Sequence, residues 1–415
     1  MTRRLQVTVM QIGLAGLLAL GLGAIPLAGQ TTAGRWITAW GVPQYGLGMT
    51  PISNATVRMI ARVTIPGESV RIRLDNTYGT SPVAIGKAYV GWRRGGGTIF
   101  PGSNRPVSFN GSGTVTIPAG GSVESDPVQM QVRAMQDLAV SLYIPGTDVR
   151  PSQHSVGLNT SYVAPNGSGD LTATQEEKPF STPTPAVLWL KSIDVLSPAG
   201  SGAIVALGDS ITFGTCSARD DYGRWTDFLA LRLDLAGRRM AVVNEAIAGN
   251  TILREHPEKL PPIGMPALDR LDRDVLSHKG VTHVILLEGT NDMRRSATAA
   301  QVSAGMEEII KRVKARGIRI IGGTAIPRHN NVNVPWDPTK TKVRHELNEW
   351  IRTKAPFDDV IDFDKLARDP SNPELMNPVM DCDGIHPSIH GYYEIGKALN
   401  LDLFRSGGGR SRSSR

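Results

Sequence analysis

Ser210, Asp383 and His386 are the residues of this 415-residue chain whose types and spacing are best suited to chemistry. A serine hydroxyl is a weak nucleophile until a neighbouring imidazole accepts its proton and a carboxylate orients that imidazole. Ser210 lies in the turn Gly208-Asp209-Ser210 that follows the short apolar run 203–207. Asp383 lies three residues before His386, so one loop can supply both acid and base. The pattern predicts acyl transfer with Ser210 as the nucleophile, His386 as the base and Asp383 as the orienting acid.

Each of these assignments has an alternative. Ser210 could serve only as the cap of the helix that follows it, which is a common use of serine. His390 is the alternative base, although it falls at the start of a predicted helix, and Asp381 is the alternative acid. The other histidines lie in helices, in strands, in a loop without an adjacent acid, or in the first half of the chain.

Acyl transfer also requires hydrogen-bond donors for the developing oxyanion, each typically worth roughly a few kcal/mol. Three candidates follow predicted strands: the backbone N–H of Ser210, the backbone N–H of Gly249 and the side-chain amide of Asn291. Glycine allows the close backbone approach that such a donor needs. Each of these residues alone is an ordinary turn residue, but together they indicate a single site at one edge of a sheet.

The elements that must position these residues are read from hydrophobic patterning in the second half of the chain. Apolar runs of strand length occur at 203–207, 241–247, 281–287, 318–326 and 360–363. Amphipathic segments of helical periodicity separate them, at 221–236, 266–278, 299–316, 338–353 and 389–401. Strand and helix in alternation predict right-handed βαβ units and a parallel three-layer α/β domain over residues 201–404. Ligands bind such sheets at the carboxyl ends of the strands.

The first half of the chain, residues 35–196, has short alternating strands separated by Gly-, Pro- and Asn-rich turns. This pattern predicts an antiparallel β-sandwich domain, with a long loop at 159–185 and a boundary at 197–202. Trp36, Trp40, Tyr89 and Trp92 are candidates for a surface that stacks on sugar rings, and the alternative is that they belong to the sandwich core or its rim.

The two ends of the chain carry most of its net charge of +7. Residues 1–30 combine a basic start, an apolar stretch and small residues, which predicts a cleaved signal peptide and a secreted or periplasmic protein without stable membrane insertion. Residues 405–415 are a basic Gly, Ser and Arg tail with too little apolar surface to fold, so we expect it to be disordered. The nearly neutral remainder argues against a nucleic-acid partner.

Cys216 and Cys382 are the only cysteines. An even number of cysteines in an oxidising compartment favours a disulfide. Cys216 lies six residues after Ser210, and Cys382 is adjacent to Asp383, so a bond between them is reasonable if both loops meet at one site. The alternative is two buried free thiols.

Four ordered sequence blocks resemble those of the SGNH/GDSL hydrolases: GDSITFG at 208–214, AGN at 248–250, GTND at 289–292 and DGIH at 383–386. The resemblance implies Ser210 as nucleophile, His386 as base, Asp383 as its partner, and Gly249 with Asn291 in the oxyanion hole. It also implies a flavodoxin-like α/β/α domain and neither a metal nor an organic cofactor. One departure is Ile211, where the name-giving block has leucine.

The first half is similar to the β-rich domain that precedes such a catalytic domain in secreted bacterial members. The similarity lies in WITAW at 36–40, VRIRLDN at 70–76 and AVSLY at 139–143. We therefore expect a secreted serine esterase that hydrolyses short-chain or acetyl esters, on small molecules or on polysaccharides. One alternative is a carbohydrate-binding protein with a silent hydrolase fold. The other is a lipase for longer acyl chains, against which the sequence shows no long apolar lid.

Overall fold

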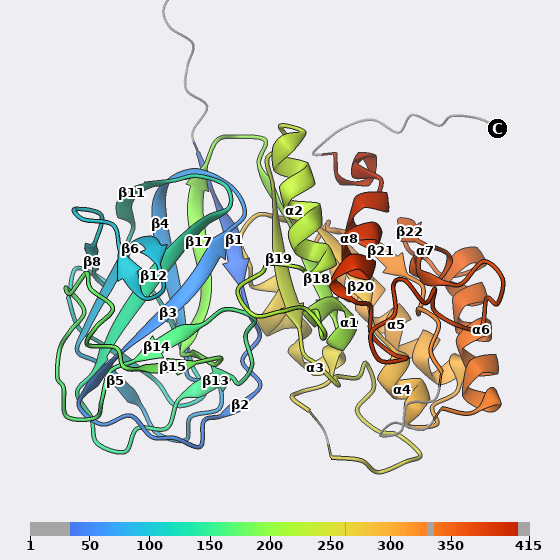
Figure 1. Ribbon diagram of the computed structural model, residues 1–415, viewed down its shortest axis with the longest axis horizontal. Helices are drawn as coiled ribbons and strands as arrows, with labels where there is room; N and C mark the ends of the chain where they lie inside the picture. The colour runs from blue at the N-terminus through green and yellow to red at the C-terminus, as the bar shows by residue number, and fades with distance from the viewer. Residues whose placement is uncertain (1–33, 262, 330–335, 406–415) are drawn as a thin grey trace, which may run out of the picture. The chain divides into compact units, whose positions relative to one another are not determined.

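The computed structural model describes residues 34–261, 263–329 and 336–405 (Figure 1). The predicted signal peptide at 1–30 and residues 406–415 of the predicted tail lie outside the described residues.

The antiparallel strands are β1 Arg35–Gly41, β2 Gly46–Leu47, β3 Ala55–Val63, β4 Gly67–Asp75, β5 Val83–Ile85, β6 Lys87–Gly95, β7 Thr98–Ile99, β8 Arg105–Val107, β9 Val115–Ile117, β10 Ser122–Glu124, β11 Val128–Val132, β12 Gln136–Ile144, β13 Ser152–His154, β14 Ser161–Val163, β15 Thr182–Thr184, β16 Val187–Leu188 and β17 Leu190–Ser197.

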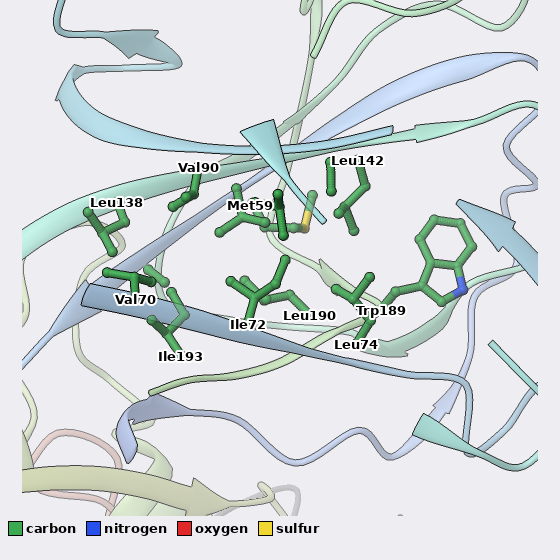
Figure 2. Packing of buried hydrophobic residues seen from close by; sticks show 14 of the residues in the cluster. Met59, Val70, Ile72, Leu74, Val90, Leu138, Leu142, Trp189, Leu190 and Ile193 are labelled. Carbon is green, nitrogen blue, oxygen red and sulfur yellow. The ribbon is translucent and has the colours of Figure 1, made fainter. Parts of the chain in front are cut away.

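Two of the antiparallel sheets enclose the core of the first half. One has the order β1-β17-β4-β10, with β11 also on β4; the other has the order β15-β14-β3-β12-β6-β7, with β8 on β6. Alternate residues of a strand point to opposite faces, so Ile72 and Leu74 of β4 meet Leu138 and Leu142 of β12 between the sheets (Figure 2). This packing forms the predicted β-sandwich core.

The outer face of β3 differs from its sequence pattern. Alternation predicts a polar, solvated face, yet Arg58 is fully buried and donates hydrogen bonds to Ser141 Oγ at 2.9 Å and to the carbonyl of Gly97 at 2.6 Å. The segment 159–185, predicted as a loop, contains β14 and β15 and covers this face. A buried arginine is stable there because backbone and side-chain acceptors satisfy its N–H groups.

The second half contains one parallel sheet. Its strands are β18 Gly202–Gly208, β19 Met240–Ala246, β20 Val281–Leu287, β21 Arg319–Gly323 and β22 Asp359–Ile361. They pair in the order β19-β18-β20-β21-β22, and every pairing is parallel. In chain order this is the 2-1-3-4-5 arrangement of flavodoxin-like sheets, in which ligands bind at the carboxyl ends of the strands near β18 and β20.

Helices cover both faces of the parallel sheet (Figure 1). They are α1 Ser210–Phe213, α2 Trp225–Leu235, α3 Ala267–Leu271, α4 Thr290–Arg294, α5 Ala299–Lys314, α6 Pro338–Thr353, α7 Phe363–Ala367 and α8 Ile389–Ala398, with a π-helix at Asp272–Leu276 and a 3₁₀ helix at Leu401–Phe404. Ile204 and Ala206 of β18 pack in the cluster that includes α2, α7 and α8, whereas Val205 and Leu207 pack with α3, α5 and α6. The predicted fold class, a three-layer α/β/α domain after an antiparallel sandwich, is confirmed.

The three short helices α1, α4 and α7 were not predicted from periodicity, because four or five residues carry too little of a repeating pattern. Two of them begin immediately after a parallel strand and carry candidate site residues. The π-helix continues α3 through most of the predicted helix at 266–278.

Direct contacts join the antiparallel and parallel parts, which belong to one compact unit. Thr38 of β1 donates its backbone N–H to the carbonyl of Lys279 at 3.0 Å, and Val242 of β19 donates its backbone N–H to Thr64 Oγ1 at 3.0 Å. Ala241 packs in the sandwich core cluster. Within the described part of the chain, none of the helices has the length and apolar character needed to cross a bilayer.

Candidate active site

Ser210 lies at the turn from β18 into α1. Gly208 is required at the end of the strand because a Cβ there would stand 2.5 Å from the carbonyl oxygen of Leu287. Asp209 is the N-cap of α1, and its carboxylate accepts the backbone N–H of Ile211 at 3.0 Å. The cap is therefore Asp209, and the hydroxyl of Ser210 is left for other partners.

The hydroxyl of Ser210 meets His386, which is 176 residues later in the chain. Its Oγ donates to His386 Nε2 at 2.9 Å, and His386 Nδ1 donates to Asp383 Oδ2 at 2.8 Å. The other carboxylate oxygen of Asp383 accepts the backbone N–H groups of Ile385 at 3.0 Å and His386 at 2.8 Å. The loop thus fixes the carboxylate against its own backbone and aims the imidazole at the serine.

The alternative base and acid lie elsewhere. His390 is exposed on α8. Asp381 accepts the backbone N–H of Gly384 at 2.8 Å through its carboxylate, which closes the turn that precedes His386. Asp381 Oδ2 also lies 4.0 Å from Nε2 of His329, a loop histidine that packs beside Gly384. These two acids therefore have different contacts, and Asp383 is the one hydrogen-bonded to the imidazole of His386.

The electrostatics of the pair favour a neutral imidazole next to an ionised carboxylate. Burial lowers the pKa of His386 below its ordinary value of 6.5, although its hydrogen bond to Asp383 acts in the opposite direction. Burial acts to raise the pKa of Asp383, but hydrogen bonds from His386 and the loop backbone outweigh it, and the pKa lies below its ordinary value. A neutral His386 can accept a proton at neutral pH.

A covalent bond and a hydrogen bond link the segments on either side of this pair. Cys216 and Cys382 form a disulfide with their Cα atoms 6.6 Å apart, which the cysteine count favoured. Tyr392 of α8 donates its hydroxyl to the carbonyl of Thr215 at 2.9 Å. Both contacts hold the segment that follows α1 against the segment that carries His386.

The three candidate oxyanion donors lie in the turns after β18, β19 and β20. Gly249 has a φ of 81°, in the left-handed region that glycine adopts at little cost. Asn291 of α4 is buried and donates one amide hydrogen to the carbonyl of Asn250 at 3.0 Å, which leaves its second amide hydrogen for another acceptor. In residues 34–261, 263–329 and 336–405, no hydrogen bond uses the backbone N–H of Ser210 or Gly249.

Asp292, the residue after Asn291, anchors the loop that follows Gly249. It is fully buried, and its carboxylate accepts the backbone N–H groups of Ile252 at 3.0 Å and Leu253 at 2.9 Å. His256 Nε2 lies 2.9 Å from the same carboxylate. The loop after β19 is therefore held against the start of α4, which places the two candidate oxyanion turns together.

Two buried arginines near the site were missed from sequence. Arg328, in the loop after β21, donates to Thr290 Oγ1 at 3.3 Å, and its charge also acts to lower the pKa of His386. Arg270 lies in α3 behind the strand ends and is fully buried. Nothing in the local pattern distinguishes them from the other arginines, because long-range contacts define their surroundings.

Two buried acids also lie behind the site. Burial raises the pKa of Asp209 to about 7 and that of Glu288, at the end of β20, to about 8. Buried carboxyl groups whose pKa values are raised in this way gather at functional sites more often than elsewhere.

The aromatic residues predicted as a sugar-stacking surface lie on two different sheets. Trp36 and Trp40 belong to β1, whereas Tyr89 and Trp92 belong to β6. The Arg71 guanidinium stacks on Trp36, with its carbon 4.0 Å from the ring centroid. Trp40 lines a cavity of about 280 Å³ between β1, β3 and α2.

The arrangement is suited to proton transfer coupled to nucleophilic attack. Ligand atoms of Cys216, Asp383 and His386 lie within 4.8 Å of one another, but the sulfur of Cys216 is bonded to Cys382 and is not a thiolate. The hydrogen-bonded series from Ser210 through His386 to Asp383 can remove the serine proton and stabilise the imidazolium that forms.

Comparison with known proteins finds one family model and several solved structures that resemble part of the chain. The model of the GDSL-like Lipase/Acylhydrolase family matches residues 206–393. The chain is similar to a solved carbohydrate acetylesterase from Sinorhizobium meliloti, with 20% identity, a TM-score of 0.37, and 48% of this chain and 96% of that chain covered. It is also similar to an M. smegmatis aryl esterase, with 19% identity, a TM-score of 0.39, and 49% and 98% covered. No curated protein matches the chain.

Proposed function

We propose that this chain is a serine esterase that uses Ser210, His386 and Asp383, because residues 206–393 match the model of the GDSL-like Lipase/Acylhydrolase family. The observation that carries the proposal is the pair of hydrogen bonds from Ser210 Oγ to His386 Nε2 at 2.9 Å and from His386 Nδ1 to Asp383 Oδ2 at 2.8 Å.

The proposed reaction has two steps. Ser210 Oγ attacks the carbonyl carbon of the ester while His386 Nε2 accepts the hydroxyl proton. The N–H groups of Ser210 and Gly249 and the amide of Asn291 stabilise the oxyanion, and the bond to the alcohol breaks as His386 returns the proton to the leaving oxygen. A water molecule, deprotonated by His386, then attacks the acyl carbon, and the bond between that carbon and Ser210 Oγ breaks as His386 returns the proton to Oγ. The acid is released and the serine hydroxyl is restored.

The proposed substrates are esters of short acyl chains, including acetyl esters on small molecules or carbohydrates. Ile263 packs directly over Gly249, so an apolar side chain borders the proposed oxyanion hole. Leu260, Ile263 and Met265 are partly exposed near this turn, which is the specific feature that favours the second candidate, a lipase for longer acyl chains. A series of p-nitrophenyl esters from acetate to laurate separates the two, because kcat/KM should fall with chain length for the proposed esterase and rise for a lipase.

The proposed location is outside the cytoplasm, either secreted or periplasmic. The signal-like composition of residues 1–30 supports this location, and the disulfide between Cys216 and Cys382 is typical of an oxidising compartment. The mass of the protein recovered from the secreting cell tests this location. Cleavage between residues 28 and 34 should give a mass that lacks the basic start.

Replacement of the nucleophile tests the proposed mechanism. Ser210→Ala should lower kcat for p-nitrophenyl acetate by roughly 10⁴- to 10⁶-fold, because loss of a catalytic serine removes covalent catalysis altogether. Ser217→Ala is the matched control: Ser217 lies seven residues further on, and within the described part of the chain its hydroxyl donates only to the carbonyl of Gly223, at 3.3 Å. Its kcat should match that of the wild type, with circular dichroism confirming the fold of both variants. Full activity in Ser210→Ala would refute the mechanism.

A further inference from the structure

Arg270 of α3 donates hydrogen bonds to three segments that border the proposed site. It is fully buried. Its Nη1 donates to the carbonyl of Glu245 near the end of β19 at 2.6 Å, and its Nη2 donates to the carbonyl of Gly208 at the end of β18 at 3.3 Å. Its Nε donates to the side-chain oxygen of Asn250 at 2.9 Å. One planar guanidinium therefore links the ends of two strands and the turn after the second.

These segments carry the proposed oxyanion donors. Gly208 lies two residues before Ser210, and Asn250 directly follows Gly249. The backbone carbonyl of Asn250 also accepts the amide of Asn291 at 3.0 Å. Oxyanion donors act over a narrow range of distances, about 2.7–3.1 Å, so a small shift of either turn reduces their effect. Arg270 is placed to hold all three donors in register.

A group of buried charges surrounds the guanidinium of Arg270. Asp274, four residues after Arg270, lies 3.6 Å from its Nη1. Lys191 Nζ and Arg273 Nε are closer, each 2.8 Å from Asp274 Oδ1. A carboxylate without these cations would attract the guanidinium strongly and compete with the carbonyl acceptors. The closer cations weaken that competition at Nη1, and the other buried carboxylate near the guanidinium, that of Glu288, lies 3.9 Å from Nη2.

Lys191 comes from the antiparallel part of the molecule, on β17, and its side chain is 1% exposed. Its Nζ contacts the carboxylates of Glu245 and Asp274 at 2.8 Å each and the carbonyl of Val42 at 3.1 Å. Burial acts to raise the pKa of Asp274, but Lys191 and Arg273 outweigh it and hold the pKa well below its ordinary value. Burying an ammonium group without such partners is costly, and these three acceptors offset that cost for Lys191.

We propose that Arg270 is a positioning residue for the oxyanion hole and that Lys191 maintains its position by neutralising Asp274. The β-rich first half then contributes to catalysis through Lys191, in addition to any role in binding. The proposal rests on the proposed function, because it assumes that Ser210 carries out ester hydrolysis.

The test compares Arg270→Met, Arg270→Lys and Lys191→Met in the full chain, with p-nitrophenyl acetate as the substrate. Arg270→Met should lower kcat by about 10- to 100-fold with little change in KM, which is less than the ~10²- to 10³-fold loss expected when an oxyanion donor itself is removed. Arg270→Lys should recover part of kcat, because an ammonium keeps the charge but cannot donate to three acceptors in one plane. Lys191→Met should lower kcat by less than Arg270→Met.

Arg58→Met is the matched control, because Arg58 is equally buried and also donates to backbone carbonyls, but on β3. It should lower the melting temperature and leave kcat unchanged. Wild-type kcat in both Arg270 variants, or an equal loss of kcat in Arg58→Met, would overturn the role of Arg270. Wild-type kcat in Lys191→Met would overturn the role of Lys191. If Arg270→Met does not fold, the kcat of Arg270→Lys decides. Absence of turnover by the wild type, or turnover by Ser210→Ala, would instead refute the proposed function.

Discussion

Arg58 in the antiparallel part and Arg270 in the parallel part are both fully buried and both donate to carbonyl groups. Arg58 holds the segment that covers the outer face of β3, where it contacts Gly97, Thr174 and Glu176. Arg270 holds the ends of β18 and β19 beside Ser210. The physical interaction is the same in both regions, and the difference lies in the type of sheet that each arginine contacts.

Sheet type determines where polar residues gather. In the parallel sheet every strand ends at the same edge, so the residues that follow β18, β19 and β20 meet one another. In the antiparallel sheets neighbouring strands end at opposite edges, and polar residues such as Arg58 are distributed among separate structural contacts. The comparison predicts that substitutions at the ends of the parallel strands lower activity, whereas substitutions such as that of Arg58 in the antiparallel sheets lower stability.

After Ser210→Ala, the largest expected effect is at the base. His386→Gln should lower kcat by about 10⁴-fold, because glutamine cannot accept the serine proton and removal of a triad member leaves only binding and oxyanion stabilisation. His390→Gln, four residues away on the exposed side of α8, should retain wild-type kcat. Steady-state hydrolysis of p-nitrophenyl acetate measures both variants. If His390→Gln lost activity and His386→Gln kept it, the base would be His390 instead of His386.

The second effect sharpens the contrast between regions. Arg58→Met should lower the free energy of unfolding by about 2–4 kcal/mol, because it leaves buried carbonyl groups without their donor. Its kcat should stay at the wild-type value. Urea unfolding followed by circular dichroism gives the first quantity, and initial rates give the second. A fall in kcat without a fall in stability would contradict the separation.

The smallest expected effect is a shift in pH dependence. Since burial lowers the pKa of His386 below 6.5, the acid limb of kcat/KM should have its midpoint below that value. The Asp383 carboxylate acts to raise the pKa of His386, so Asp383→Asn should move the midpoint of its residual activity lower still. Profiles of kcat/KM against pH measure both midpoints. A wild-type midpoint at or above 6.5, or an upward shift in Asp383→Asn, would contradict the electrostatic description.

Much of the fold could be predicted from local patterns. The run at 281–287 coincides with β20, and the amphipathic segment at 338–353 coincides with α6. Period and length identify such elements because their burial repeats along the sequence. The buried outer face of β3 could not be predicted in the same way, because the segment 159–185 that covers it lies about a hundred positions later in the chain.

The residues of the candidate site differ in the same way, because some follow a local pattern and others depend on long-range contacts. Ser210, Gly249, Asn291 and the Asp383–His386 loop could be predicted, because each directly follows a strand or lies in a recognisable block. Arg270 could not, because its proposed role depends on three acceptors from separate segments, two at strand ends and one in the turn after β19.

The most direct test of the account is covalent labelling of the serine by a p-nitrophenyl phosphonate, followed by mass spectrometry of the digested protein. The account predicts one phosphonyl group per chain, attached to Ser210, with labelling strongly slowed in His386→Gln. Attachment at another residue, or labelling of Ser210 at an undiminished rate without His386, would contradict the claim that the imidazole activates this hydroxyl.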